Sequence, residues 1–389
     1  MLLKKKKITY FYIFGFLIFI LVNLGLLKLV DRGIPFLERS IGEKSNTRIS
    51  FEEKEPEQLL RFKGIKEPYS RNRYISYVTW GYKDTASPDS NIVGGYRRSY
   101  EHTCSLNQIK KTIWMFGGST MLGQGSPDDF TIPSFLCKEL KKKYPETCWR
   151  CENYGIGGYV FTQEIFLFIR FLQKENPRPD LVIFYDGVND FIASLQGYPT
   201  EHHNFTKIRD TYEVKPIPLK NQLFNYLPNI TRTLKRFLYQ PGASNNNMNL
   251  IQENLLKSSK IYKFNFHLLN NIGLGENLKI IAAFQPTVFS KIPLSEYEQW
   301  HLDNYNYTSF TNKELRPLWD FYYLNVMKQN LGSSSNTSFV DLTQTFNEAN
   351  HSIFYNPGDW MHVNWNGNIR VAKALSEVVT THLEIDMAD

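Results

Sequence analysis

Three side chains in two distant blocks have the types and spacing needed for nucleophilic chemistry. Ser119 follows an apolar run that ends in two glycines, and glycines allow a tight turn without steric cost. Asp359 and His362 stand three residues apart near the end of the chain, about one helical turn. An ionised Asp359 could accept the Nδ1–H of His362 and leave Nε2 free to take a proton from Ser119. This is the arrangement of nucleophile, base and orienting acid.

Each block alone also fits a structural role. Ser119 could simply cap a helix, and short motifs carry a false-positive risk. The pair His202-His203 could suggest a metal site, but no further ligands cluster nearby, so we expect a solvated loop there. The other histidines lack an acid at the spacing of Asp359 and His362 in a comparable context; they are His102, His202, His203, His267, His301, His351 and His382.

Two further blocks could supply hydrogen-bond donors to a developing oxyanion. Gly158 closes the glycine-rich segment that starts at Asn153, and Asn189 lies in the segment Asp186-Gly-Val-Asn-Asp190. Donors aimed at developing negative charge often contribute most to catalysis. The alternatives are a plain turn at Gly158 and a helix-capping role for Asn189.

The elements that would position these residues alternate between strands and helices. Apolar runs predict strands, and amphipathic spacing predicts helices. This alternation is typical of an α/β fold with a central parallel sheet, and ligands of such sheets bind beyond the carboxyl ends of the strands. The predicted strands are Ile113–Phe116, Cys151–Tyr154, Asp180–Tyr185, Leu278–Phe284 and Ser338–Leu342, and the predicted helices are Ile132–Lys143, Thr162–Lys174 and Asn364–Leu383.

Taken together, the four blocks resemble the SGNH (GDSL-type) hydrolase family over about residues 110–385. The resemblance implies a three-layer α/β/α sandwich with a flavodoxin-like parallel sheet. It implies that Ser119 is the nucleophile, with Asp359 and His362 completing the triad. It also implies an oxyanion hole made by the Ser119 N–H, the Gly158 N–H and the Asn189 amide. The family's Gly-Asp-Ser-Leu reads Gly-Gly-Ser-Thr here, and the missing acid is not the proton acceptor in that family.

Charge and hydropathy concentrate at the N-terminus. The formal charge of the 389 residues is +7, and the five lysines among residues 1–30 account for all but +2 of it. No basic block follows, so we expect no nucleic-acid partner.

Residues 8–30 are nearly all apolar and form a run long enough to cross a bilayer, and Lys4–Lys7 would keep the preceding tip cytoplasmic. We therefore expect an uncleaved signal anchor, a single-pass membrane protein and an extracytoplasmic catalytic domain; a cleaved signal peptide is the alternative.

The predicted organisation has three parts. Residues 1–31 form the Lys-rich tip and the transmembrane anchor, residues 32–109 a stalk and lead-in region, and residues 110–389 the hydrolase-like domain. Two polar stretches, near 191–260 and 286–312, interrupt the regular pattern. We interpret them as insertions at the rim of the site, and variable surface loops are the alternative.

The four cysteines, Cys104, Cys137, Cys148 and Cys151, allow three disulfide pairings, between which the sequence does not choose. Cys148 and Cys151 have the C-x-x-C spacing of redox and zinc sites, but a zinc site would need a second pair or nearby histidines. We expect structural disulfides or buried thiols, with no metal and no cofactor.

These patterns predict a serine esterase acting on O-acyl esters, such as O-acetyl groups of cell-surface glycans or lipid esters. An O-acyltransferase using the same residues is the close alternative. A catalytically inactive domain that binds a glycan or a partner protein is the third reading, since a motif does not guarantee an activity.

Overall fold

The central element of the computed structural model is a seven-stranded sheet with the strand order β3-β4-β6-β5-β7-β8-β9. The structure describes residues 73–174, 177–199, 248–304, 310–354 and 359–383. Strands β5 to β9 are parallel to one another, whereas β4 is antiparallel to both β3 and β6. The strands are β3 (Ile92–Val93), β4 (Tyr96–Arg97), β5 (Ile109–Gly117), β6 (Thr147–Asn153), β7 (Leu181–Asp186), β8 (Lys279–Phe284) and β9 (Thr337–Asp341).

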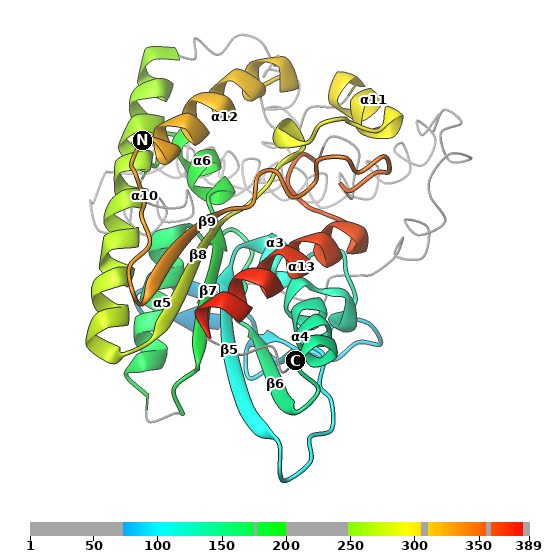
Figure 1. The fold of residues 1–389 in the computed structure, drawn as a ribbon. Helices are drawn as coiled ribbons and strands as arrows, with labels where there is room; N and C mark the ends of the chain where they lie inside the picture. The colour runs from blue at the N-terminus through cyan, green and yellow to red at the C-terminus, as the bar shows by residue number, and fades with distance from the viewer. Residues whose placement is uncertain (1–72, 175–176, 200–247, 305–309, 355–358, 384–389) are drawn as a thin grey trace, which may run out of the picture. The chain divides into compact units, whose positions relative to one another are not determined.

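Helices cover both faces of this sheet (Figure 1). One face is covered by α4 and α13, which pack against each other, and the other by α5 and α10. Both helices α6 and α12 pack against α10. The helices are α3 (Ser119–Leu122), α4 (Ile132–Lys143), α5 (Phe161–Leu172), α6 (Val188–Leu195), α10 (Met248–Glu276), α11 (Glu296–Asn304), α12 (Asn312–Met327) and α13 (Trp365–His382), with 3₁₀ turns η2 (Asp128–Phe130) and η3 (Val288–Ser290).

Local sequence explains the main elements. All six residues of β7 are buried, as expected of a central strand of a parallel sheet that is covered on both faces. At the start of α4, the Thr131 hydroxyl accepts the Ser134 N–H, and at the start of α13, the Asn364 side chain accepts two backbone N–H groups. These caps satisfy donors that a helix leaves unpaired at its N-terminus.

The α/β class, the mostly parallel sheet and the five predicted strands are confirmed, with ends that differ by a few residues. Helices α10 and α12 were not predicted. Within the stretch 191–260, predicted as an insertion, residues 191–195 belong to α6 and residues 248–260 to α10, while residues 200–247 lie outside the described part. Part of the stretch 286–312 forms η3 and α11. The weak amphipathic pattern of α10, which carries asparagines and lysines throughout its length, explains why it was missed.

The described part of the lead-in region, residues 73–109, contributes strands. A hairpin of β1 (Arg73–Ile75) and β2 (Thr79–Gly81) forms a separate two-stranded sheet, whereas β3 and β4 extend the main sheet. Arg97 of β4 is buried and donates through Nε to Asp128 Oδ1 at 2.6 Å. This ion pair ties the lead-in to the 3₁₀ turn before α4.

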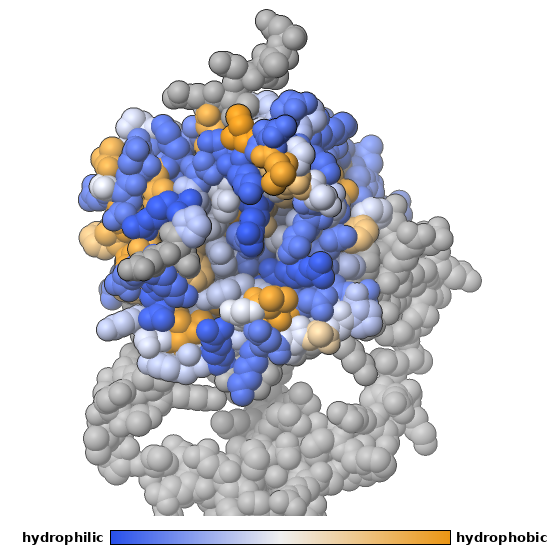
Figure 2. Space-filling view, turned by 90° about the horizontal axis from the view of Figure 1, so that it is seen from below, coloured by the Kyte–Doolittle hydropathy of each residue, from blue (hydrophilic) through white to orange (hydrophobic). Residues whose placement is uncertain are grey.

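The predicted anchor at residues 8–30 lies outside the described residues. Among the helices that the structure describes, none combines the length and apolar character needed to cross a bilayer. Figure 2 shows the molecule from below relative to Figure 1, and its coloured surface is mostly hydrophilic, with hydrophobic residues in small separate groups.

The cysteines form one disulfide and one pair of buried thiols. Cys104 and Cys148 are bonded, whereas Cys137 and Cys151 are free. Cys148 and Cys151 both belong to β6, and side chains three residues apart on a strand point to opposite faces of the sheet. The C-x-x-C spacing therefore does not bring these two sulfurs together.

Three carboxyl groups are buried close to one another between the sheet and its helices. They are Glu164 of α5, Asp186 at the end of β7 and Asp190 of α6. Burial raises all three pKa values, and mutual repulsion raises those of Glu164 and Asp186 further. The pKa of Asp190 rises to about 6, because burial outweighs the hydrogen bond that it accepts from the Phe161 N–H.

An acid whose pKa is raised on folding keeps its proton to a higher pH in the folded state than in the unfolded state. Its contribution to the free energy of unfolding is present at low pH and is lost as pH rises from about 4 through the raised value. We predict that Asp186→Asn raises the Tm at pH 8, by roughly 2–4 °C per kcal/mol gained. The gain should shrink at pH 5. The control Asp89→Asn, which changes an exposed carboxyl group, should leave the Tm unchanged at both pH values. Thermal unfolding at both pH values measures this, and an equal or lower Tm for Asp186→Asn at pH 8 would contradict it.

Candidate active site

Ser119, His362 and Asp359 form a continuous chain of hydrogen bonds. The Ser119 Oγ lies 2.7 Å from His362 Nε2, and His362 Nδ1 lies 2.7 Å from Asp359 Oδ2. All three side chains are buried, at 9%, 5% and 8% exposed respectively. The structure thus brings together two blocks that are 243 residues apart in the sequence.

Ser119 is positioned by a strand that turns sharply into a helix. It follows β5 and is the first residue of α3, so its backbone N–H belongs to the group that has no acceptor within the helix. At Gly117, an added Cβ would meet the Tyr185 carbonyl oxygen at 2.7 Å. The two glycines therefore allow the turn to approach neighbouring backbone and side chains closely.

Asp359 and His362 are held by their own backbone. The Asp359 Oδ1 accepts the N–H groups of Met361 and His362 at 3.1 and 3.0 Å. Burial alone would raise the Asp359 pKa, but the charge of His362 and the hydrogen bonds from His362 and Met361 together hold it below its usual value. An ionised Asp359 fixes the tautomer in which His362 Nδ1 donates and Nε2 accepts the Ser119 hydroxyl proton.

Asn189 and Gly158 lie beside the serine turn. The Asn189 Nδ2 donates to the Tyr159 carbonyl at 2.7 Å, which leaves its second N–H available. The Asn189 Nδ2 is also the atom nearest to where a Cβ on Gly118 would lie, so the amide contacts the turn that carries Ser119. Gly158 has φ +83°, a backbone conformation that favours glycine. Its N–H has no hydrogen-bond acceptor among the described residues.

Asn153 has a structural role in the same region. Its Nδ2 donates to the Met121 carbonyl at 3.0 Å and its Oδ1 accepts the Gly155 N–H at 3.0 Å. It therefore ties the glycine-rich turn after β6 to α3. Gly155 packs so closely that an added Cβ would collide with the backbone of Leu122.

Sequence reasoning missed Gln285, which directly follows β8. Its backbone N–H donates to the Asp186 carbonyl at 3.0 Å, and its Oε1 lies 3.4 Å from the Thr120 hydroxyl. The Gln285 Nε2 is buried without a partner among the described residues. A polar residue at the carboxyl end of a predicted strand was the available signal, because ligands of parallel sheets bind at that edge.

A buried ion pair, also missed, supports the segment that leads to the Asp359–His362 block. The side chains of Lys291 and Glu298 are 0% and 2% exposed and contact each other. Lys291 Nζ donates to the His351 carbonyl at 3.0 Å, and Glu298 Oε1 accepts the Ile353 N–H at 2.7 Å. The Ile353 carbonyl in turn accepts the Asn364 N–H at 2.7 Å. The ion pair therefore connects, through Ile353, to the residues that flank His362.

No protein-family model and no curated protein sequence matches the chain. Solved structures that are similar in part include a catalytic mutant of an acetylxylan esterase from Geobacillus stearothermophilus, at 14% identity and a TM-score of 0.38, covering 72% of this chain and 98% of that one. A lipase from a goat rumen metagenome has 12% identity, a TM-score of 0.40 and coverages of 69% and 96%. A lipolytic G-D-S-L family member from Veillonella parvula has 12% identity, a TM-score of 0.33 and coverages of 69% and 98%. At these values, the similarity by itself assigns no activity.

We predict that Gly118→Ala lowers kcat for hydrolysis of p-nitrophenyl acetate by about 10²–10³-fold, the usual effect of losing one oxyanion donor. The added methyl group would collide with the Asn189 amide and displace it. Gly275→Ala is the matched control, because a Cβ there meets no atom within 4 Å. Full activity of the Gly118→Ala variant would contradict a role for the Asn189 amide in stabilising the oxyanion.

We predict that Glu298→Gln lowers the free energy of unfolding by about 3–5 kcal/mol, because it leaves the buried Lys291 without a counter-charge. It should also lower kcat more than it changes KM, since the buried pair supports the segment that carries His362. The double variant Lys291→Met/Glu298→Gln should recover most of the lost stability. Denaturant unfolding and steady-state kinetics measure both effects. Equal stability of Glu298→Gln and the wild type would contradict this role.

Proposed function

We propose that this chain is a serine esterase of the SGNH (GDSL) type that acts on O-acyl esters. The observation that carries the proposal is the pair of 2.7 Å contacts that joins Ser119 to His362 and His362 to Asp359. A buried serine hydroxyl within hydrogen-bond distance of an oriented imidazole is the signature of an activated nucleophile.

The reaction follows from this geometry. His362 Nε2 takes the Ser119 hydroxyl proton while Oγ attacks the acyl carbonyl, and the ionised Asp359 stabilises the imidazolium. The Ser119 N–H, the Gly158 N–H and the Asn189 amide stabilise the oxyanion of the tetrahedral intermediate. Collapse expels the alcohol, which receives the proton from His362. Water then attacks the acyl-enzyme by the same route and releases the carboxylic acid.

The substrate class follows from the proposed location. We propose that residues 8–30 anchor the chain in the membrane with the catalytic domain outside the cytoplasm, which rests on the apolar run and the lysines before it. A domain tethered there meets surface glycans and lipids, so the proposed substrate is an acyl ester of one of these, such as an O-acetyl group. The three-layer α/β/α family architecture is part of the same proposal, and the helices on both faces of the sheet support it.

We predict that a fluorophosphonate probe labels the full-length, detergent-purified protein and that Ser119→Ala abolishes the labelling. Ser333→Ala, which changes an exposed serine, is the matched control and should label normally. Asp359→Asn should lower kcat for a p-nitrophenyl ester by about 10⁴-fold.

The outcomes separate the competing functions. A folded wild-type protein that neither labels nor hydrolyses esters would indicate a binding domain. With a donor labelled in its acetyl group, release of free acetate supports the hydrolase, whereas transfer of the label to a carbohydrate would identify an acyltransferase.

A further inference from the structure

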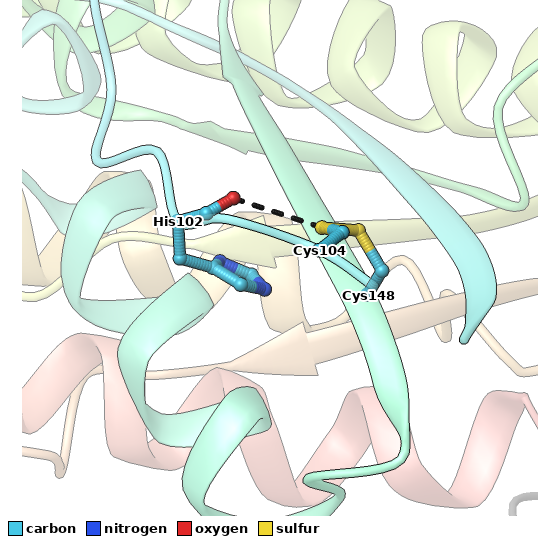
Figure 3. A group of neighbouring side chains, drawn as sticks. All are labelled: His102, Cys104 and Cys148. Carbon is cyan, nitrogen blue, oxygen red and sulfur yellow. Dashed lines mark hydrogen bonds between the residues drawn. A yellow bond between two sulfur atoms is a disulfide. The ribbon is translucent and has the colours of Figure 1, made fainter. Parts of the chain in front are cut away.

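His102 lies beside the disulfide between Cys104 and Cys148 (Figure 3). The two cysteines have Cα atoms 5.6 Å apart, and Cys148 is the second residue of β6. The sulfur atoms and a ring nitrogen of His102 all lie within 4.8 Å of one another. Two sulfurs and an imidazole nitrogen thus lie close enough together to be considered as ligands of one ion.

Both ring nitrogens of His102 are buried, and in the described part of the chain neither makes a hydrogen bond. The ring stacks on Tyr100, with centroids 6.0 Å apart. A buried polar atom without a partner costs about 1–3 kcal/mol, and such atoms call for an explanation. A ligand that accepts the nitrogen lone pair would provide one.

The disulfide is accessible. A cavity of about 880 Å³ is lined by the segment 96–102, by Cys104 and Cys148 and by the start of β5, and Cys104 itself is partly exposed. The cavity gives a reductant access to the sulfurs and gives water access to a bound ion. The other two cysteines, Cys137 and Cys151, are buried free thiols.

We propose that reduction of the Cys104–Cys148 disulfide creates a Zn²⁺ site made by these two cysteines and His102, with water from the cavity as fourth ligand. Two thiolates and an imidazole suit Zn²⁺ and not hard cations, which prefer oxygen. A dithiol reductant supplies two electrons and two protons, so the S–S bond breaks, two thiols form and the reductant closes its own disulfide. Zn²⁺ then displaces the two thiol protons to the solvent.

The required rearrangement is small. Zn–S bonds of about 2.3 Å and Zn–N bonds of about 2.0–2.1 Å place the ligand atoms of one site roughly 3.5–4 Å apart. The His102 nitrogen lies within 4.8 Å of both sulfurs, so the ring has only a short remaining distance to close while the sulfurs separate. The Cys104 Sγ lies 3.6 Å from the His102 carbonyl oxygen, which can accept the Cys104 S–H once the disulfide is open.

This site is separate from the esterase centre. Cys148 pairs with Lys110 near the amino end of β5, whereas Ser119 follows the carboxyl end of the same strand. At about 3.3 Å per residue, the length of β5 separates them. Metal binding and ester hydrolysis can therefore be tested independently, and a negative result for one proposal does not contradict the other.

The test uses Co²⁺ as a spectroscopic substitute for Zn²⁺ on the full-length protein in detergent. Protein reduced with a dithiol and desalted without oxygen should bind one Co²⁺ with a sulfur-to-cobalt charge-transfer band, which Zn²⁺ abolishes. Unreduced protein should lack the band that this site adds. Because Cys137 and Cys151 are thiols in both forms, any ion that they bind appears in both and is subtracted.

Two variants identify the ligands. His102→Ala should weaken Co²⁺ binding at least about ten-fold, given the effects seen even for residues that only support metal ligands, and Cys104→Ser should remove the band. His267→Ala, which changes an exposed histidine, is the matched control. The proposal is overturned if reduced wild-type protein shows no band or loses its near-ultraviolet circular dichroism, or if His102→Ala binds as tightly as wild type.

Discussion

The parallel pairing of β5 with β7 and of β7 with β8 is the constraint on which the rest of the site depends. The register sets Gly117 beside Tyr185 and Asp186 beside Phe284, so three strands end at one level. The residues that follow them, Ser119, Asn189 and Gln285, must then lie at one edge of the sheet. Parallel pairing of the central strands therefore brings residues that are far apart in the sequence to the same edge of the sheet.

Much of this arrangement was predictable because it depends on local and periodic signals. The run Leu181–Tyr185 is apolar throughout, as a strand buried on both faces must be, and the glycines before Ser119 indicate a tight turn. The block from Asp359 to His362 is predictable because its two side chains are close in sequence. In each case the residue types and their spacing carry the information.

The remainder depends on pairings that no local pattern encodes. Lys291 and Glu298 are charged residues in a polar stretch, and only tertiary contact with His351 and Ile353 makes them a buried support. Glu164 lies on the same buried, mostly apolar face of α5 as Phe161 and Phe168, and its burial beside Asp186 depends on the crossing of α5 over the sheet. The choice of Cys148 as the partner of Cys104 likewise depends on where the lead-in region meets β6.

One of the two outermost strands of the main sheet, β3, is very short, which has a consequence for association between chains. β3 has two residues and β9 has five, and the free side of β3 already pairs at Ile92 with Thr85. Few unpaired backbone groups are therefore exposed at the β3 margin, and long exposed margins are what recruit foreign strands and nucleate fibrils. The β3 margin of the sheet is thus protected from growing by strand addition.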